Sequence, residues 1–151
     1  MQRQQFAYKV DQLFEHVTLA EDEELLFYSS LGKYGVQPFS AYLIRNNRFD
    51  EWAALHQLHP SSMSYLETCG LKVVLAENPA VTLPLYHHFA MDELRQKSRV
   101  NYKQAVRIWK SMRSAAKKAS KTSFFEDYIA VVRSENKRLR ALQEEMDKGN
   151  L

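Results

Sequence analysis

The chain has 151 residues, of which 45% are apolar, with four glycines, four prolines and a single cysteine. This composition is typical of one globular domain, here residues 1–151, that buries a core without needing a metal or a disulfide. No segment approaches the roughly 18 apolar residues of a membrane span, and the first residues lack the apolar core of a signal peptide. The sequence therefore predicts a cytoplasmic protein that does not contact membranes.

The net charge of +3 is distributed unevenly along the chain. Residues 1–94 contain six basic and twelve acidic side chains, a net charge of −6. Residues 95–151 contain fifteen basic and six acidic side chains, a net charge of +9. The small total therefore conceals a strongly basic C-terminal part.

Apolar residues recur at helical spacing along the whole chain, and no long alternation of β-branched residues indicates strands. In chain order, we expect helices over about 6–17, 18–31, 38–44, 49–58, 63–69, 71–77, 85–98, 99–120 and 124–147. Gly32 and Gly35 are expected to take the left-handed conformation that ends a helix. Serines at 61 and 62, and Thr122 with Ser123, are expected to cap the helices that follow them.

This pattern predicts an all-α fold, an array of about eight or nine helices in antiparallel hairpins, as in an α-solenoid or a TPR-like protein. A weak internal repeat supports the array. The segments 48–54 and 124–130 share a Phe, two acids, a large aromatic residue and a final Ala, and each is placed where a helix is expected to start. Independent use of favourable helix-start residues also explains the similarity.

The strongest local feature is residues 95–121, which contain ten basic residues and no acidic one. On a helix that turns about 100° per residue, seven of them fall within about 120° of one another. We call these seven residues the basic stripe: Arg99, Lys103, Arg107, Lys110, Arg113, Lys117 and Lys121. The opposite face is apolar and includes Trp109, which is expected to lie in the core.

Neighbouring like charges destabilise a helix, so helix stability alone does not favour the basic stripe. One interpretation is a surface for an anionic partner, either the acidic face of a protein or a nucleic-acid backbone. Few aromatic residues interrupt the stripe, so base stacking has little support. A solvated face is the other interpretation, as is docking against the acidic first part of the chain near residues 21–24.

Catalytic and metal-binding patterns are weak. His87 and His88 are adjacent and point to different faces of a helix, and neither they nor His56 and His59 have the spacing of zinc ligands. Cys69 has no base near it in sequence and is expected to be a small buried residue. We therefore expect no metal, no cofactor and no enzymatic activity, with a pocket near His87 and His88 as the alternative if the protein is an enzyme.

Three segments of the last half carry a family resemblance: Leu83-Pro84-Leu85-Tyr86-His87-His88, then Asn101-Tyr102-Lys103-Gln104-Ala105-Val106, then Arg138-Leu139-Arg140-Ala141-Leu142-Gln143-Glu144-Glu145. Over about residues 80–151 the chain resembles the C-terminal helical region of bacterial SWIM zinc-finger proteins. The resemblance implies DNA or protein binding, the activities in which this family is thought to act.

The zinc finger of that family is a Cys-x-Cys followed by a distant Cys-x-His, which a chain with one cysteine does not contain. No zinc-binding role carries over. The resemblance implies that the chain is a C-terminal fragment of a longer protein, or a relative that lacks the finger. Our expectation from the sequence is a non-enzymatic interaction module that binds protein through the basic stripe, with nucleic-acid binding as the alternative.

Overall fold

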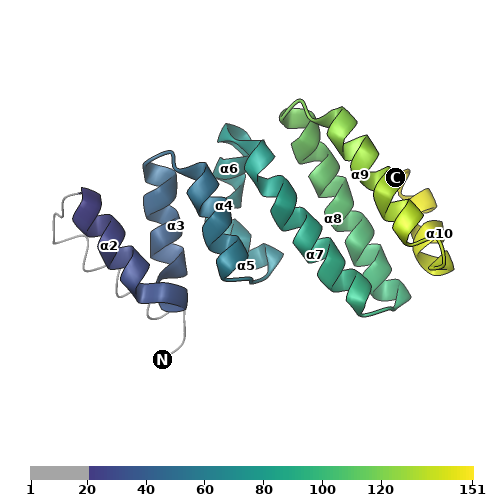
Figure 1. Ribbon diagram of the computed structural model, residues 1–151, viewed down its shortest axis with the longest axis horizontal. Helices are drawn as coiled ribbons and strands as arrows, with labels where there is room; N and C mark the ends of the chain where they lie inside the picture. The colour runs from purple at the N-terminus through teal and green to yellow at the C-terminus, as the bar shows by residue number, and fades with distance from the viewer. Residues whose placement is uncertain (1–20) are drawn as a thin grey trace. The chain divides into compact units, whose positions relative to one another are not determined.

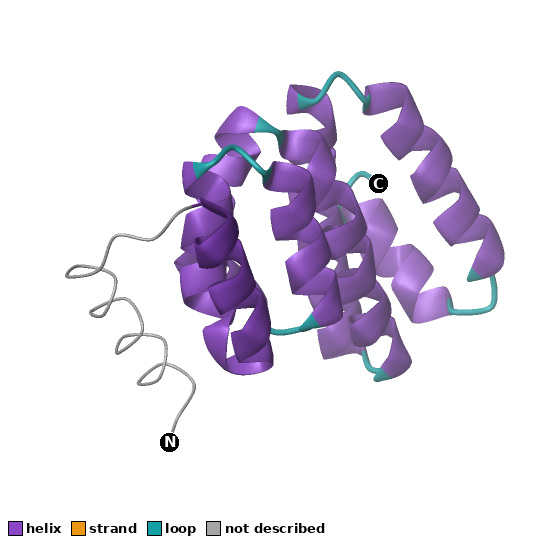
Figure 2. Cartoon of the chain, turned by 60° about the vertical axis from the view of Figure 1, so that its left-hand side comes forward, coloured by secondary structure: helices purple, strands orange, loops and turns teal. Residues whose placement is uncertain are grey.

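The computed structural model describes residues 21–151, with side chains described from residue 23 onward. Every regular element in this range is helical (Figures 1 and 2). There are nine α-helices and two short 3-10 helices in the described range: α2 (Glu21–Leu31), η1 (Gly32–Gly35), α3 (Val36–Arg45), α4 (Phe49–Leu58), α5 (Met63–Thr68), α6 (Leu71–Glu77), η2 (Pro79–Thr82), α7 (Leu83–Arg95), α8 (Arg99–Lys118), α9 (Thr122–Glu135) and α10 (Arg140–Lys148).

The all-α prediction is confirmed for the described residues, and the bounds of α4, α6 and α8 match the expected ones closely. The expected helix over residues 6–17 and the start of the one expected over 18–31 lie outside the described residues. The solenoid or TPR-like arrangement and the internal repeat stay predictions. The second copy of the repeat lies inside α9, which begins two residues before it.

The chain divides into two compact units, residues 1–74 and 75–151, which are described separately below. The expectation of a single domain stays a prediction. In the described part of the first unit, α2 packs against α3 through aromatic rings. Tyr28 lies 5.9 Å from Phe39 and 5.4 Å from Tyr42 between ring centroids. Trp52 of α4 is fully buried, and its indole N–H donates a hydrogen bond to the main-chain oxygen of Cys69.

Helix ends in the first unit follow local chemistry in part. Ser62 caps α5, as expected, because its hydroxyl accepts a hydrogen bond from the backbone N–H of Tyr65. Gly32 has the expected positive φ of 56°. The prediction for Gly35 is wrong, because its φ is −106°. Glycine suits this position for another reason, since a Cβ atom there would lie 2.4 Å from the Cβ of Leu31.

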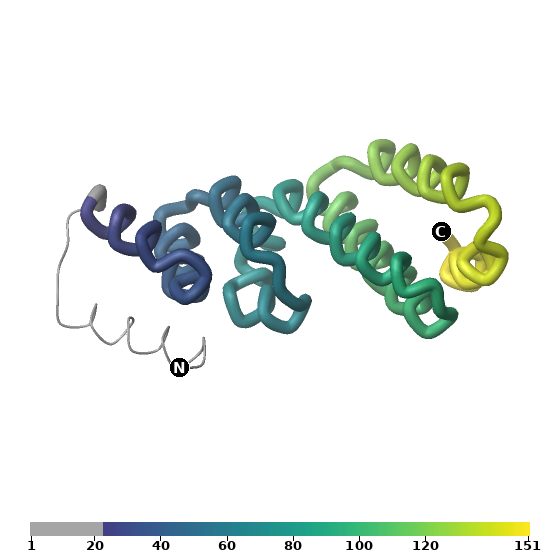
Figure 3. The backbone as a smooth tube through the Cα atoms, turned by 60° about the horizontal axis from the view of Figure 1, so that its bottom comes forward, coloured from purple at the N-terminus to yellow at the C-terminus, as the bar shows by residue number. Residues whose placement is uncertain are grey.

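The second unit is built around α8, which packs against η2, α7, α9 and α10 (Figure 3). Ser98 caps α8 by accepting a hydrogen bond from the backbone N–H of Asn101. The apolar face of α8 is buried as the sequence predicts, and Trp109 is fully buried at its centre. The amphipathic pattern therefore identified the inward face of this helix correctly.

The predicted single helix over 124–147 is wrong, because α9 ends at Glu135 and α10 begins at Arg140. The chain turns at Asn136, whose side-chain amide donates to the main-chain oxygen of Val132. This turn brings α10 back against α8 and buries Leu142 and Met146 completely. The expected cap at Thr122 and Ser123 is also wrong, because the N-cap is Lys121 and no side chain caps α9.

Candidate interaction site

The structure separates the seven residues of the basic stripe into two groups. Arg99 and Arg113 form hydrogen bonds with the C-terminal part of the second unit, and Lys121 lines a separate cavity. Four cations remain together on the outer side of α8, which we call the α8 basic face: Lys103, Arg107, Lys110 and Lys117. All four side chains are exposed, and none of them forms an ion pair with another described residue.

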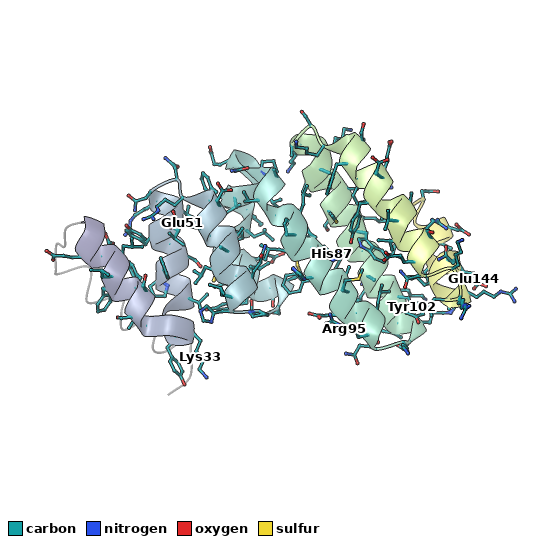
Figure 4. All side chains as sticks on the ribbon, viewed as in Figure 1. Lys33, Glu51, His87, Arg95, Tyr102 and Glu144 are labelled. Carbon is teal, nitrogen blue, oxygen red and sulfur yellow. The ribbon has the colours of Figure 1, made fainter. Side chains whose placement is uncertain are left out.

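Arg99 is paired with the C-terminal helix of its own unit. Its guanidinium donates hydrogen bonds of 2.9 Å to Glu144 and of 2.9 Å to Glu145 of α10. Figure 4 shows Glu144 projecting from α10. Burial acts to raise the pKa of Glu145, but the hydrogen bond from Arg99 and the charges of Lys148 and Lys103 outweigh it, so this pKa lies below its usual value. Arg99 therefore has a structural role in docking α10.

Arg113 and Lys121 differ from the four cations of the α8 basic face in their contacts, although Arg113 lines the same cavity as Lys117. The guanidinium of Arg113 donates a 2.9 Å hydrogen bond to the main-chain oxygen of Asn150, beside a cavity of about 710 Å³ between α8, α9 and the last two residues. Lys121 follows the end of α8 and lines a different cavity. Lys121 was assigned to the stripe because the helix was expected to run to about residue 120, whereas α8 ends at Lys118; Arg113 lies within α8, and its contact with Asn150 comes from tertiary packing.

A second surface feature of this unit is a groove of about 700 Å³, which we call the α7–α9 groove. Its walls come from η2 and α7 on one side and from α9 on the other, with Met112 of α8 between them. The lining residues are Ala80, Leu83, Pro84, His87, Met112, Lys121, Phe124, Tyr128 and Val131. Phe124 and Val131 are each 53% exposed, so two large apolar side chains face solvent along one wall.

A chain of hydrogen bonds crosses the unit at this groove. The indole N–H of Trp109 donates to the Tyr128 hydroxyl at 3.1 Å, and this hydroxyl lies 2.7 Å from Nδ1 of His87. Trp109 only donates, and whether Tyr128 or His87 donates in the second bond depends on the tautomer of His87. Burial raises the pKa of Tyr128, against the effect of the Trp109 hydrogen bond. Burial, followed by the charge of His88, lowers the pKa of His87, so both groups stay neutral at pH 7.

The two adjacent histidines differ as expected from helical geometry. His87 lines the α7–α9 groove and is labelled on α7 in Figure 4, whereas His88 is exposed. No Ser, Thr or Cys lines the groove, and Nδ1 of His87 is already engaged by Tyr128. The groove can therefore bind apolar groups and donate hydrogen bonds, but it holds no activated nucleophile of the serine or cysteine type. Within residues 21–151 no three His, Cys, Asp or Glu side chains are grouped as metal ligands.

Sequence reasoning missed one polar pair, in the first unit. Nε2 of His56 lies 2.8 Å from the hydroxyl of Ser40, and both residues are buried. Nδ1 of His56 has no hydrogen-bond partner among the described residues. Burial, and then the charge of His59, lowers the pKa of His56 to about 4. The pair is enclosed beside Trp52 and contributes to the packing of the core. The only sequence signal for it was the position of His56 among the buried residues of α4.

Fold and site together define an all-α protein with a basic helical face and a separate apolar groove. Among curated proteins, the chain is similar to the uncharacterized protein YwqB of Bacillus subtilis (strain 168), with 38% identity over 118 residues. The match covers 78% of this chain and 22% of YwqB, so the chain spans about a fifth of the length of the curated relative it matches. No family model matches the chain. No solved structure matches it either.

None of the helices between residues 21 and 151 is at once long enough and apolar enough to span a bilayer.

Proposed function

We propose that this chain is a non-enzymatic helical interaction module that binds the acidic surface of a protein partner through the α8 basic face. The observation that carries the proposal is the set of four exposed cations with no ion pair to another described residue, on a helix that is otherwise firmly packed. The four residues extend over about 21 Å of the helix axis. Their mutual repulsion is relieved when carboxylates approach them.

Two features favour a protein partner over a nucleic acid. The side chains exposed between the four cations include Gln104, Ser111 and Ser114 and no aromatic ring on which a base would stack. The carboxylate of Glu144, which is 44% exposed, borders the first turn of α8. Glu144 and Glu145 pair with Arg99, so the unpaired cations are confined to the α8 basic face, which suits a limited acidic patch on a protein better than a continuous phosphate backbone. Nucleic-acid binding through the same face is the alternative.

The experiment compares retention of the protein on immobilised polyglutamate and on nonspecific duplex DNA as salt is raised. A variant with Lys103, Arg107, Lys110 and Lys117 replaced by Ser removes the α8 basic face. A control variant removes the same charge from exposed cations elsewhere: Lys72, Lys97, Lys137 and Arg138. We expect the first variant to lose polyglutamate retention at a salt concentration at which the wild type and the control are held.

The possible results separate the two partners. Retention on duplex DNA that persists to higher salt than retention on polyglutamate replaces the protein proposal by the nucleic-acid alternative. Equal loss of retention in the two variants shows that net charge, and not the α8 basic face, is responsible. Circular dichroism of each variant checks that the helices are retained.

We propose in addition that the chain belongs to a longer protein of the SWIM zinc-finger type, as its C-terminal helical region. The resemblance over residues 80–151 supports this, together with a relative of which the chain matches only about a fifth. The test is to inspect the unmatched part of YwqB, and the reading frame upstream of this chain, for Cys-x-Cys followed by Cys-x-His. Reading frames that contain no such motif contradict the proposal.

A further inference from the structure

The α7–α9 groove lies on the side of α8 opposite to the α8 basic face. Met112, which lies between its walls, is separated by at least about 140° around the helix axis from Lys103, Arg107, Lys110 and Lys117. The proposed function therefore leaves this second surface unused. Phe124 and Val131 remain half exposed on it, although burial of such side chains is favourable.

The groove has the dimensions of a helix-binding site. Phe124, Tyr128 and Val131 follow one another on one face of α9, and Leu83 and His87 are one turn apart on α7. The seven residue steps from Phe124 to Val131 correspond to about 10.5 Å along the axis, or about two turns. A partner helix presents its apolar anchors at the same spacing, at i, i+3 or i+4, and i+7.

The charge and hydrogen-bonding groups of the groove determine what the partner must carry. Lys121 is the only charged residue among those that line it. The other polar atom of the lining side chains without a hydrogen-bond partner among the described residues is Nε2 of His87, which donates or accepts according to its tautomer. The groove thus offers one cation and no side-chain carboxylate, so a complementary partner supplies a carboxylate beside its apolar residues.

We propose that the α7–α9 groove docks an amphipathic helix of a protein partner, with its apolar side chains between α7 and α9 and a carboxylate at Lys121. This inference rests on the proposed role as a protein-binding module, and it assigns that role a second surface. The apolar contacts provide the affinity. The charge of Lys121 determines the direction in which the partner helix lies in the groove.

Two indole signals give a direct readout of occupancy. In a ¹⁵N-labelled sample of the whole chain, the N–H of Trp109 reports on the groove because it donates to Tyr128, which lines the groove. The N–H of Trp52 donates to Cys69 in the first unit and serves as the internal control. The chain contains only these two tryptophans, so the two signals are assigned with a single Trp52→Phe variant.

The probe is a synthetic peptide of about five helical turns, with Leu at i, i+3 and i+7 and with Glu beside the leucines. An isomeric peptide has the same composition with the leucines distributed around the helix, and a third peptide has Lys in place of Glu. We expect the first peptide to shift the Trp109 signal and to leave the Trp52 signal in place. The isomer and the Lys peptide should bind at least about tenfold more weakly.

Variants then locate the binding. Phe124→Gln and Val131→Gln, at half-exposed positions, should each weaken binding of the first peptide by about tenfold or more. Val100→Gln, at a position 70% exposed on α8 outside the groove lining, is the matched control and should leave binding unchanged. Lys121→Glu should weaken binding of the Glu peptide and strengthen binding of the Lys peptide.

Other occupants give different results, and each overturns the proposal. Equal binding of the isomeric peptide shows that only an apolar surface is recognised, without a helix. Concentration-dependent dimerisation that Phe124→Gln abolishes shows that a second copy of this chain occupies the groove. The variant with four serines on the α8 basic face should still bind the first peptide, so a failure of the proposed function is distinguishable from a failure of this inference.

Discussion

Arg99, the first residue of helix α8, hydrogen-bonds Glu145 of α10 at 2.9 Å across 46 positions of sequence. The carboxylate side chain of Glu145 is only 7% exposed, so this contact is made at the edge of the core. A residue that helical spacing assigned to a binding surface therefore holds the C-terminal helix in place. The same contact ties the returning helix α10 to the start of α8.

Replacement of Arg99 should loosen α10. Arg99→Gln removes the cation that both Glu144 and Glu145 contact, and it leaves Glu145 with Lys148 as its remaining ion-pair partner. We expect a lower melting temperature and faster hydrogen exchange in α10 than in the wild type. Arg107→Gln is the matched control, because Arg107 forms no ion pair with another described residue. Equal melting temperatures for the two variants would falsify the structural role of Arg99.

Trp109 should be among the most sensitive positions of the second unit. It is fully buried, so Trp109→Ala is expected to lower the free energy of unfolding by about 3 to 5 kcal/mol in urea titrations. Tyr128→Phe leaves the indole N–H without its acceptor, and this should cost about 1 to 3 kcal/mol. Phe124→Ala, at a half-exposed position, should cost less than Trp109→Ala. Unfolding midpoints that are the same for all three variants would contradict this placement of Trp109.

Gly149 allows the C-terminal end of α10 to approach α8 closely. A Cβ atom at this position would lie 2.7 Å from Cγ1 of Val106, which is too close for two carbon atoms. Gly149→Ala should therefore reduce the free energy of unfolding by about 1 to 3 kcal/mol through overpacking. Val106→Ala relieves the clash in the double variant. The destabilisation of the double variant should therefore be smaller than the sum of the destabilisations of the two single variants. Simple additivity would show that the approach is not tight.

Stability should depend on pH through His56. Its pKa is about 4 in the folded protein, against an ordinary value of 6.5, because burial disfavours the charged ring. The neutral ring stabilises the fold fully above pH 6.5, and this contribution is lost as the pH falls from 6.5 towards 4. The loss is on the order of 3 kcal/mol.

The measurement for His56 is the free energy of unfolding at pH 7, 6, 5 and 4. His56→Gln should remove this part of the pH dependence, whereas His88→Gln, at an exposed position, should keep it. A pH profile of His56→Gln that superimposes on the wild type would rule out His56 as the source. Ser40→Ala should destabilise the protein at pH 7 by about 1 to 3 kcal/mol, because it leaves Nε2 of His56 without its partner.

The helices that depend on local chemistry could be predicted from the amino-acid sequence. Amphipathic spacing identified α8 and the buried position of Trp109, and Ser62 caps α5 as its side chain allows. These features depend on residues within one or two helical turns of each other, so the sequence pattern alone predicts them. The four cations of the α8 basic face are exposed for the same reason.

The roles of the remaining residues depend on tertiary packing. The pairing of Arg99 with Glu145 and the hydrogen bond between Tyr128 and His87 join residues 46 and 41 positions apart in the sequence. No glycine or proline directly follows Asn136 to indicate a turn in the sequence. The helix ends there because burying Leu142 and Met146 against α8 stabilises the fold more than continuing α9 as one longer helix would. The +9 charge of residues 95–151 was therefore visible in the sequence, but which of its cations remain available to a partner depends on how α10 folds back.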